Sequence, residues 1–288
     1  MNKYILIPLL FLVLHTSCKT KWDFEIDNFE PKIVVDGWIE SGNVAIVCLS
    51  QTRSLNSNVD SMTIAEIPIR WAKVTVSDGE TEEVLTGRID KNYTPSFIYR
   101  GNLMVGEPGK TYTLTVEYSG KTVTAVTTIP QPVPLSDIQV SRCADSDTLF
   151  QINAYIDDNP SEKNFYKFFT RVTNNENRFY ASFLGTIDDA VVKDSQSAIP
   201  IYKSMHLTNT PNKYIPFFHI EDTVLVKFTQ IPQHGFEFWN GYENEITNGQ
   251  NPLFPSNTNL KSNITGGLGI WCGYGVTLYE LVIKRDLQ

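Results

Sequence analysis

Lys110 to Tyr118, with the sequence KTYTLTVEY, decides the fold together with Lys121 to Ile129, KTVTAVTTI, which follows it after two residues. Large apolar residues occupy every second position of the first run from Tyr112 on, and threonines and a glutamate occupy the positions between them. A period of two residues is typical of a β-strand with one buried face. Ser119-Gly120 has the length of a tight turn, so the two runs predict a β-hairpin.

Short strands are also predicted upstream of this hairpin, because apolar or β-branched runs alternate there with turn residues such as Asp78-Gly79. The spacing of these runs is typical of a sandwich of two antiparallel sheets. They cover Lys32 to Glu40, Val44 to Thr52, Ala72 to Ser77 and Phe97 to Arg100. We therefore expect an immunoglobulin-like β-sandwich over residues 32–130.

The proline-rich segment Pro130-Gln131-Pro132-Val133-Pro134 interrupts this pattern. Proline cannot donate a backbone hydrogen bond to a sheet and favours a stiff, extended chain, so the segment predicts a domain boundary. The alternative is a crossover between strands inside one larger domain. A chain of 288 residues is long enough for two domains of ordinary size, each with its own core.

Residues 131–288 predict a second β-rich domain that contains one helix. Its strands are expected at Asp147 to Asp157, Asn164 to Thr173, Tyr214 to His219 and Thr223 to Gln230, with a last strand that ends at Ile283. Near residues 233–246 large apolar residues recur at helical spacing, namely Phe236, Trp239, Tyr242 and Ile246. The whole sequence therefore predicts a mostly all-β fold with one amphipathic helix, whose aromatic stripe faces the core.

The first residues resemble a bacterial lipoprotein signal peptide. Lys3 supplies a positive charge, and Tyr4 to Leu14 form an apolar segment that is too short to span a bilayer permanently. The small residues Thr16-Ser17 then precede Cys18. This order of charge, apolar segment and small residues predicts cleavage directly before the cysteine.

We therefore expect residues 1–17 to be a lipoprotein signal peptide, Cys18 to be the site of lipid attachment, and residues 18–31 to form a tether. His15 stands where the usual motif has leucine. The alternative interpretation is an ordinary secretory signal followed by a chance cysteine.

Composition excludes nucleic acid as an expected partner. The formal net charge is −8, the isoelectric point is near 5.1, and the chain has no run of lysine or arginine. With 12% aromatic and 19% charged residues, the chain has enough apolar surface to fold rather than to stay disordered.

No catalytic residue, cofactor or metal is predicted. The patterns of a nucleophile elbow, a zinc-protease helix and a phosphate-binding loop are all absent from the sequence, and the glycines of Gly266 to Gly275 indicate tight packing within a sheet. Cys48 and Cys272 lie in apolar runs and are predicted to be buried, and with Cys143 they allow at most one disulfide. The three histidines after the signal segment lack the spacing of metal ligands on one element: His206, His219 and His234.

Six segments, taken with their order and spacing, carry a resemblance to a known family. They are Ile33 to Ile39 (IVVDGWI), Ala72 to Gly79 (AKVTVSDG), Gly106 to Leu114 (GEPGKTYTL), Thr127 to Pro130 (TTIP), Asn164 to Tyr166 (NFY) and Asn263 to Ile270 (NITGGLGI). This set resembles the DUF4249 lipoproteins of Bacteroidota and covers nearly the whole chain after Cys18. The resemblance implies an outer-membrane lipoprotein, often encoded near TonB-dependent receptors, and it implies no catalytic residues.

Two further expectations follow from the resemblance. Asp23, Glu25 and Asp27 resemble the acidic signal that directs Bacteroidota lipoproteins to the outer face of the outer membrane, although a solvated linker with a few charges is the alternative. Triplets of aspartate, serine or threonine, and an apolar residue resemble the O-glycosylation acceptor of these bacteria. They predict sugars on Ser61, Thr148 and Thr223.

The expected function is that of a non-enzymatic, surface-exposed lipoprotein that acts as accessory subunit to a TonB-dependent transporter. Most of the contact with the transporter is expected from the C-terminal domain, which holds the long loop Gly249 to Asn263 with Phe254. The alternative is a free-standing lipoprotein that binds glycan or peptide through exposed loops, and an enzyme is the third hypothesis.

Overall fold

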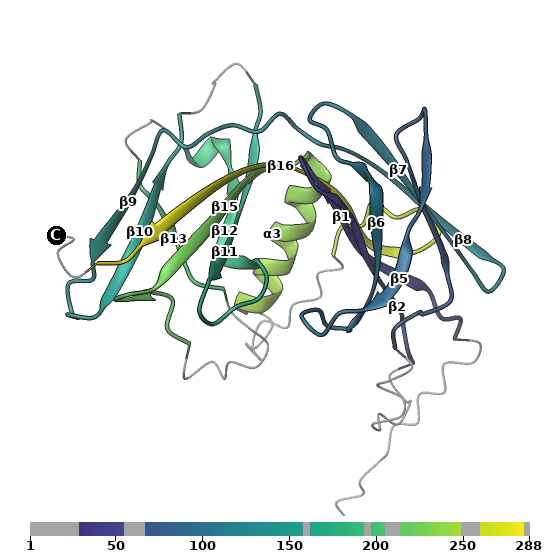
Figure 1. Ribbon diagram of the computed structural model, residues 1–288, viewed down its shortest axis with the longest axis horizontal. Coiled ribbons are helices and arrows are strands. Elements are labelled where there is room, and N and C mark those ends of the chain that lie inside the picture. Colours follow the sequence, from purple (N-terminus) through teal and green to yellow (C-terminus); the bar gives the residue numbers. More distant parts are fainter. Residues whose placement is uncertain are drawn as a thin grey trace, which may run out of the picture.

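Strands make up most of the regular structure, as the alternating sequence predicts (Figure 1). The computed structural model describes residues 29–54, 67–157, 162–192, 197–204, 214–248 and 260–284. Within these residues the strands form three sheets, and they are accompanied by one α-helix, α3 (Gln233–Asn248). The predicted mostly β fold with one helix is therefore confirmed.

The largest sheet contains eight strands and runs through both halves of the molecule. Their order across the sheet is β12 (Tyr180–Asp188), β11 (Phe165–Val172), β15 (Thr223–Gln230), β16 (Leu268–Val282), β1 (Ile33–Glu40), β2 (Val44–Gln51), β6 (Phe97–Val105) and β5 (Thr86–Ile89). The long strand β16 pairs antiparallel with β15 and parallel with β1. One strand therefore joins elements from the two halves of the sequence.

Two four-stranded sheets pack on one face of the large sheet. The first has the order β4 (Glu82–Val84), β3 (Lys73–Ser77), β7 (Thr111–Tyr118) and β8 (Lys121–Thr128). The second has the order β13 (Ile199–Ile201), β10 (Leu149–Tyr155) and β14 (Phe218–His219), with β9 (Asp137–Arg142) also paired to β10. Trp271 lies in the first core and Tyr279 packs against the second, and both project from the same face of β16. The two β-sandwiches therefore share the large sheet.

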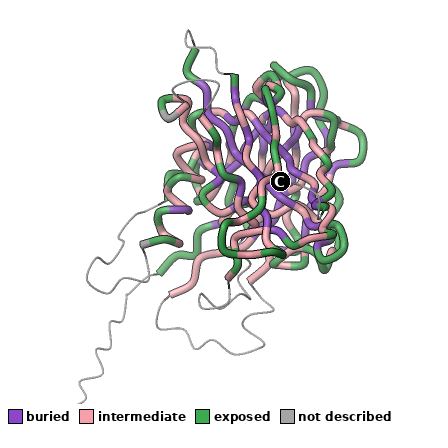
Figure 2. The backbone as a smooth tube through the Cα atoms, turned by 90° about the vertical axis from the view of Figure 1, so that its left-hand side faces the viewer, coloured by how far each residue is buried: buried purple, intermediate pink, exposed green. Residues whose placement is uncertain are grey.

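The predicted hairpin is confirmed by β7 and β8, which pair antiparallel along their whole length. Ser119 and Gly120 have positive φ angles of 50° and 74°, as a two-residue hairpin turn of this kind requires. Tyr112, Leu114 and Val116 are buried in the first core, whereas the residues between them are not. Figure 2 shows the same division over the molecule, with buried backbone in the middle of the strands and exposed backbone at the turns.

The helix α3 covers part of the opposite face of the large sheet. Phe236 and Trp239 pack there against β11 and β16, where the rings of Phe165 and Phe236 stack with centroids 4.6 Å apart. Trp239 also donates a hydrogen bond of 3.0 Å from Nε1 to the hydroxyl of Tyr274. The predicted helix is confirmed, and Phe236 and Trp239 of its predicted aromatic stripe face the core. No helix in the described part of the chain is both long and apolar enough to span a membrane.

Several strands escape prediction from the sequence, chiefly β9 and β12. The pairing of β12 with β11 shifts register between Lys167 and Phe169, and Leu184 within β12 has a φ of 51°. Such a bulge breaks the two-residue period on which the prediction depends. The short 3₁₀ helix η1 (Asp189–Val191) follows β12, and β14 covers only the last two residues of the strand predicted at 214–219.

The chain passes from β8 of the first sandwich to β9 of the second through the proline-rich segment 130–134. The last strand returns across this boundary, because Ile264 and Trp271 belong to the first core. β16 thus belongs to both sandwiches, although the predicted division assigns it to residues 131–288. Whether residues 32–130 fold independently stays a prediction.

Glycines in β16 allow other backbone segments to approach it closely. Gly269 has a φ of 109°, and a Cβ atom there would overlap the carbonyl oxygen of Val35 in β1. At Gly273 a Cβ atom would lie 2.5 Å from the carbonyl oxygen of Thr128. The predicted role of these glycines in sheet packing is confirmed.

Replacing Gly269 by alanine is expected to lower the free energy of unfolding by more than about 3 kcal/mol, because the new methyl group meets rigid backbone at a positive φ. Gly42→Ala is the matched control, since its φ of 77° is also positive but no atom lies within 4 Å of the added Cβ. It should cost about 1 kcal/mol. Urea unfolding measures both, and equal losses would show that the pairing of β1 with β16 does not depend on Gly269.

Candidate functional site

One face of the large sheet carries polar side chains in register beside α3. The helix packs mainly against β11, β12 and β16, and the same face of β1, β2, β6 and β5 lies next to it. Backbone pairing aligns one residue of each of these four strands in a row: Asp36, Cys48, Ile98 and Arg88. The next row contains Trp38, Ile46 and Arg100.

Arg178 lies near this face and comes from the connection between β11 and β12. Its guanidinium lies 4.7 Å from the ring centroid of Tyr93 and 4.3 Å from that of Tyr180. Tyr93 follows β5 and lies beside Trp38, with ring centroids 6.1 Å apart, so both halves of the chain contribute to the contact. We define the junction cluster as Asp36, Trp38, Tyr93, Arg100, Arg178 and Tyr180.

The guanidinium of Arg178 lies over aromatic rings, and one of its nitrogen donors is unpaired. Its Nε atom is buried without a hydrogen-bond partner, and none of the ion pairs between described residues includes this arginine. The two rings hold the group by cation–π contacts. A buried donor without a partner costs stability, and natural proteins rarely keep one without a reason. This arrangement favours a binding group over a structural one.

Asp36 is the acidic group that acts on Arg178 from the sheet. Burial raises the pKa of its carboxyl above the ordinary value, and the charge of Arg178 opposes that rise. The residue is nevertheless exposed to water. The raised pKa and the exposure are compatible if protein atoms surround the carboxylate on several sides but leave one side open to water. A ligand can reach the carboxylate from that side.

Cys48 lies next to Asp36 in the same row, and its buried position was predicted. Burial raises the pKa of its thiol to about 12, and the charge of Asp36 adds to the rise. The thiol therefore stays protonated at neutral pH and is a poor nucleophile. Cys272 is also buried, as predicted, and Cys48, Cys143 and Cys272 are all free thiols.

Two lysines on the same face of the sheet form close ion pairs, which Arg178 does not. Lys167 Nζ lies 2.5 Å from Glu243 Oε1 in α3 and also donates to the carbonyl oxygen of Ser182. Burial lowers the pKa of Lys167, and the charge of Glu243 opposes the shift. Lys227 in β15 pairs with Glu40 in β1 and so links the two halves of the chain. These buried pairs support the fold.

The predicted modification sites lie apart from the junction cluster or outside the described residues. Cys18 and Ser61 are outside them. Thr148 is exposed just before β10, with its hydroxyl 3.4 Å from that of Ser146. Thr223 begins β15 and is half-buried. Lipid attachment and glycosylation stay predictions.

The histidines are not brought together. His206 lies outside the described residues, His219 is exposed in β14, and His234 in α3 has Nε2 3.1 Å from Thr127 Oγ1. Burial lowers the pKa of His234, which keeps its ring neutral at neutral pH. Across the described ranges, His, Cys, Asp and Glu side chains form no group of three or more that could hold a metal ion.

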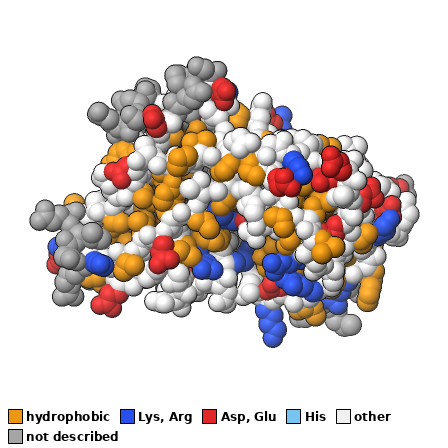
Figure 3. All heavy atoms as spheres, turned by 45° about the horizontal axis from the view of Figure 1, so that its top comes forward, with side chains coloured by type: hydrophobic (Ala, Val, Ile, Leu, Met, Phe, Trp, Pro, Cys, Tyr) orange, Lys and Arg blue, Asp and Glu red, His pale blue; other side chains and the backbone are white. Residues whose placement is uncertain are grey.

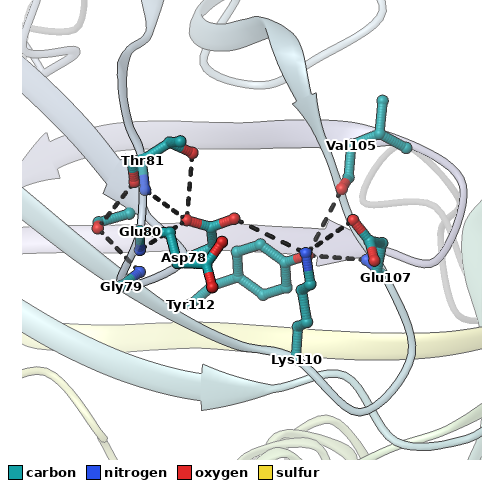
Figure 4. A network of polar contacts seen from close by, with 9 residues as sticks. Asp78, Gly79, Glu80, Thr81, Val105, Glu107, Lys110 and Tyr112 are labelled. Carbon is teal, nitrogen blue, oxygen red and sulfur yellow. Dashed lines mark hydrogen bonds and ion pairs between the residues drawn. The ribbon is translucent and has the colours of Figure 1, made fainter.

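Two of the segments that carry the family resemblance meet in a polar network at the first sandwich (Figure 4). Asp78 accepts backbone hydrogen bonds from Thr81 (2.8 Å) and Glu80 (3.1 Å), and these bonds lower the pKa of its carboxyl. Lys110 lies 3.9 Å from Asp78 and 2.9 Å from Glu107. The network fastens the turn after β3 to the loop before β7, so these segments serve the fold.

A separate hollow of about 360 Å³ lies in the second sandwich. It is lined by Cys143, Ala144, Asp145, Ser146, Leu149, Gln151 and Phe217. Figure 3 shows hydrophobic side chains at the surface over the left-hand part of the molecule, which carries β9, β10 and β13 in Figure 1. The lining offers no cation and no buried donor without a partner, so we place the candidate site at the junction cluster.

Sequence reasoning did not single out Asp36 or Arg178. A signal for Asp36 exists, because it is a charged residue inside the apolar strand IVVDGWI. No local pattern marks Arg178, since its partner Tyr93 is distant in the sequence and belongs to the other half of the chain.

Comparison with protein families matches residues 19–280 of this chain to the family described as a domain of unknown function, DUF4249. Comparison with curated proteins finds none that matches.

Asp36→Asn is expected to leave the free energy of unfolding at pH 7 unchanged or to raise it, because the native protein bears the cost of keeping this carboxylate charged. Because the pKa of Asp36 is higher in the native state than the ordinary value of 3.8, the native state binds the proton first as the pH falls. Asp36 therefore increases the free energy of unfolding at low pH, and this contribution is lost as the pH rises through the native pKa. The variant should lack that part of the pH dependence. Urea unfolding across acidic and neutral pH tests this, and a loss above about 1 kcal/mol at pH 7 would show a structural role instead.

Proposed function

Since this chain belongs to the DUF4249 family, we propose that it is a non-enzymatic lipoprotein of the outer membrane of Bacteroidota that binds a ligand at the junction cluster. In this proposal a lipid on Cys18 anchors it at the cell surface, where it acts as accessory subunit to a TonB-dependent transporter. The signal-like residues 1–17 and the acidic tether support the location. The family resemblance implies genes that often lie near those of TonB-dependent receptors, and this supports the transporter as partner.

The observation that carries the proposal is Arg178, whose guanidinium lies over two tyrosine rings and whose buried Nε has no partner. Asp36 supplies an acceptor that water can reach, and Trp38 supplies an aromatic surface beside Tyr93. Ligand sites of proteins combine aromatic side chains with a few polar groups in this way. They also form preferentially between two packed units, as here between the two sandwiches.

The chemistry of the cluster supports binding over catalysis. The nucleophile nearest to Asp36 in its row is the thiol of Cys48, whose pKa of about 12 keeps it protonated at neutral pH. Arginine side chains bind anions through their fork of donors and are not proton-transfer groups, so Arg178 suits the binding of an anion.

Exposed apolar side chains on the first sandwich support a protein partner. Trp71 is 89% exposed and Leu103 is 84% exposed, and Ile89 is exposed as well. Tryptophan and other aromatic residues are enriched at protein interfaces. The contact predicted for the loop 249–263 involves residues 249–259, which lie outside the described residues. Exposed apolar side chains are described on both sandwiches, with Leu278 and Val282 of β16 among them, and the most exposed ones lie on the first.

The second candidate is a free-standing lipoprotein that binds glycan or peptide without a transporter. The two candidates share the anchor and the ligand site and differ in the partner alone.

Cys18→Ala is expected to release the protein from the membrane, because a diacylglycerol on this thiol is the proposed anchor. Cys143→Ala is the matched control and should stay membrane-bound, since Cys143 lies half-buried in the second sandwich. Fractionation of outer membranes after a high-salt wash measures both. Full retention of the Cys18→Ala protein would contradict the lipoprotein hypothesis.

A TonB-dependent transporter is expected to copurify with the protein from mildly solubilised outer membranes, enriched over a control lipoprotein. Trp71→Ser combined with Leu103→Ser should reduce the enrichment without loss of folding, because both side chains are exposed. Deletion of residues 249–259 tests the predicted loop, and it spares Asn263, whose amide binds the backbone of Trp271 at 2.8 and 2.9 Å. Recovery of the protein alone would overturn the accessory role in favour of the free-standing one.

A further inference from the structure

We infer that the junction cluster binds an acidic sugar unit, which is a hydroxyl-bearing ring with a carboxylate. The inference deepens the ligand-binding part of the proposed function, on which it rests, and it does not depend on the transporter partner. Three features of the cluster select this chemistry: the arginines, the aspartate and the aromatic rings.

The arginines favour an anionic group on the ligand. Arg178 has a planar fork of donors, and carboxylates accept two parallel hydrogen bonds from such a fork. Arg100 acts on Tyr93 electrostatically, as Arg178 does, and Arg88 projects from the same face of the neighbouring strand. Against these three cations stand Asp36 and Asp90. The surface is therefore locally cationic on a protein with a net charge of −8.

Asp36 narrows the choice among anions. Its carboxylate can only accept hydrogen bonds when it is charged, and it repels a small anion such as phosphate. A ligand that satisfies both groups places its own negative charge at the arginines and hydrogen-bond donors, such as hydroxyl groups, at Asp36. Sugar acids carry both within one ring.

The aromatic rings supply an apolar surface for the C–H face of a sugar. Trp38 and Tyr93 are both partly exposed, and their rings are inclined by only 31° to each other. Tyr242 in α3 also lies close enough to Asp36 for the carboxylate to raise the pKa of its phenol, after the larger effect of burial. Its hydroxyl offers a further hydrogen-bond partner on the side of the helix.

Titration calorimetry of the whole chain, purified in mild detergent, tests the inference. The probes are a galacturonic acid trimer and the neutral galactose trimer, with inorganic phosphate and a peptide with a free C-terminal carboxylate as comparisons. The acidic trimer should bind at least about tenfold more tightly than each of the other three, because it alone matches both Arg178 and Asp36.

Arg178→Lys should weaken binding of the acidic trimer by about tenfold, because lysine keeps the charge and lacks the planar fork. The matched control is Arg142→Lys, which also lies over an aromatic ring, Phe150, at 5.9 Å, and should bind as the original protein does. If Arg178→Lys fails to fold, Asp36→Asn is the second variant, with a similar loss of affinity expected and no loss of stability.

Equal affinity for the neutral trimer, tighter binding of the peptide or phosphate, or unchanged affinity in both variants would overturn the sugar-acid inference and leave a binding role intact. No binding of any probe would overturn the inference too. Failure of the transporter to copurify concerns the accessory role alone, so the two results are distinguishable.

Discussion

The parallel pairing of β1 with β16 is the contact on which the rest of the structure depends. These strands come from opposite ends of the described chain, and they can approach because Gly269 has no side chain to meet the carbonyl group of Val35. β16 is long enough to continue and to pair with β15. Its side chains therefore enter both cores, with Trp271 in the first and Tyr279 against the second. One strand thus places two sandwiches on a single sheet.

The polar side chains on the opposite face of that sheet come from both halves of the chain, because the sheet is continuous. Alternation along β1 places Asp36, Trp38 and Glu40 on the face away from the first core. Glu40 meets Lys227 of the second sandwich, and the charge of Arg178 from beyond β11 reaches Asp36. The junction cluster therefore exists only because residues of both halves are held in one register.

The cations on this face differ in how far the fold satisfies them. Lys167 has Glu243 and a backbone carbonyl, and Lys227 has Glu40. Arg178 has two tyrosine rings and a buried Nε without a partner. Breaking a buried ion pair is costly because it leaves a charge uncompensated. Lys167 and Lys227 therefore have a structural role. Arg178 and Asp36 depart from the rule that buried polar groups are paired, since Arg178 has an unsatisfied donor and Asp36 has a raised pKa. Functional sites show departures of this kind.

Local periodicity determined the β-hairpin at 110–129, the helix at 233–246 and the mostly β class, because the spacing of apolar residues records which face of an element is buried. It missed β12, where a register shift beside Phe169 breaks the period. It also placed the last strand with residues 131–288, whereas Trp271 lies in the first core. Strand pairing depends on contacts between residues that are far apart in the chain, and no local pattern records them. For that reason only the tertiary structure decided that β16 is shared and that Asp36 and Arg178 belong to one site.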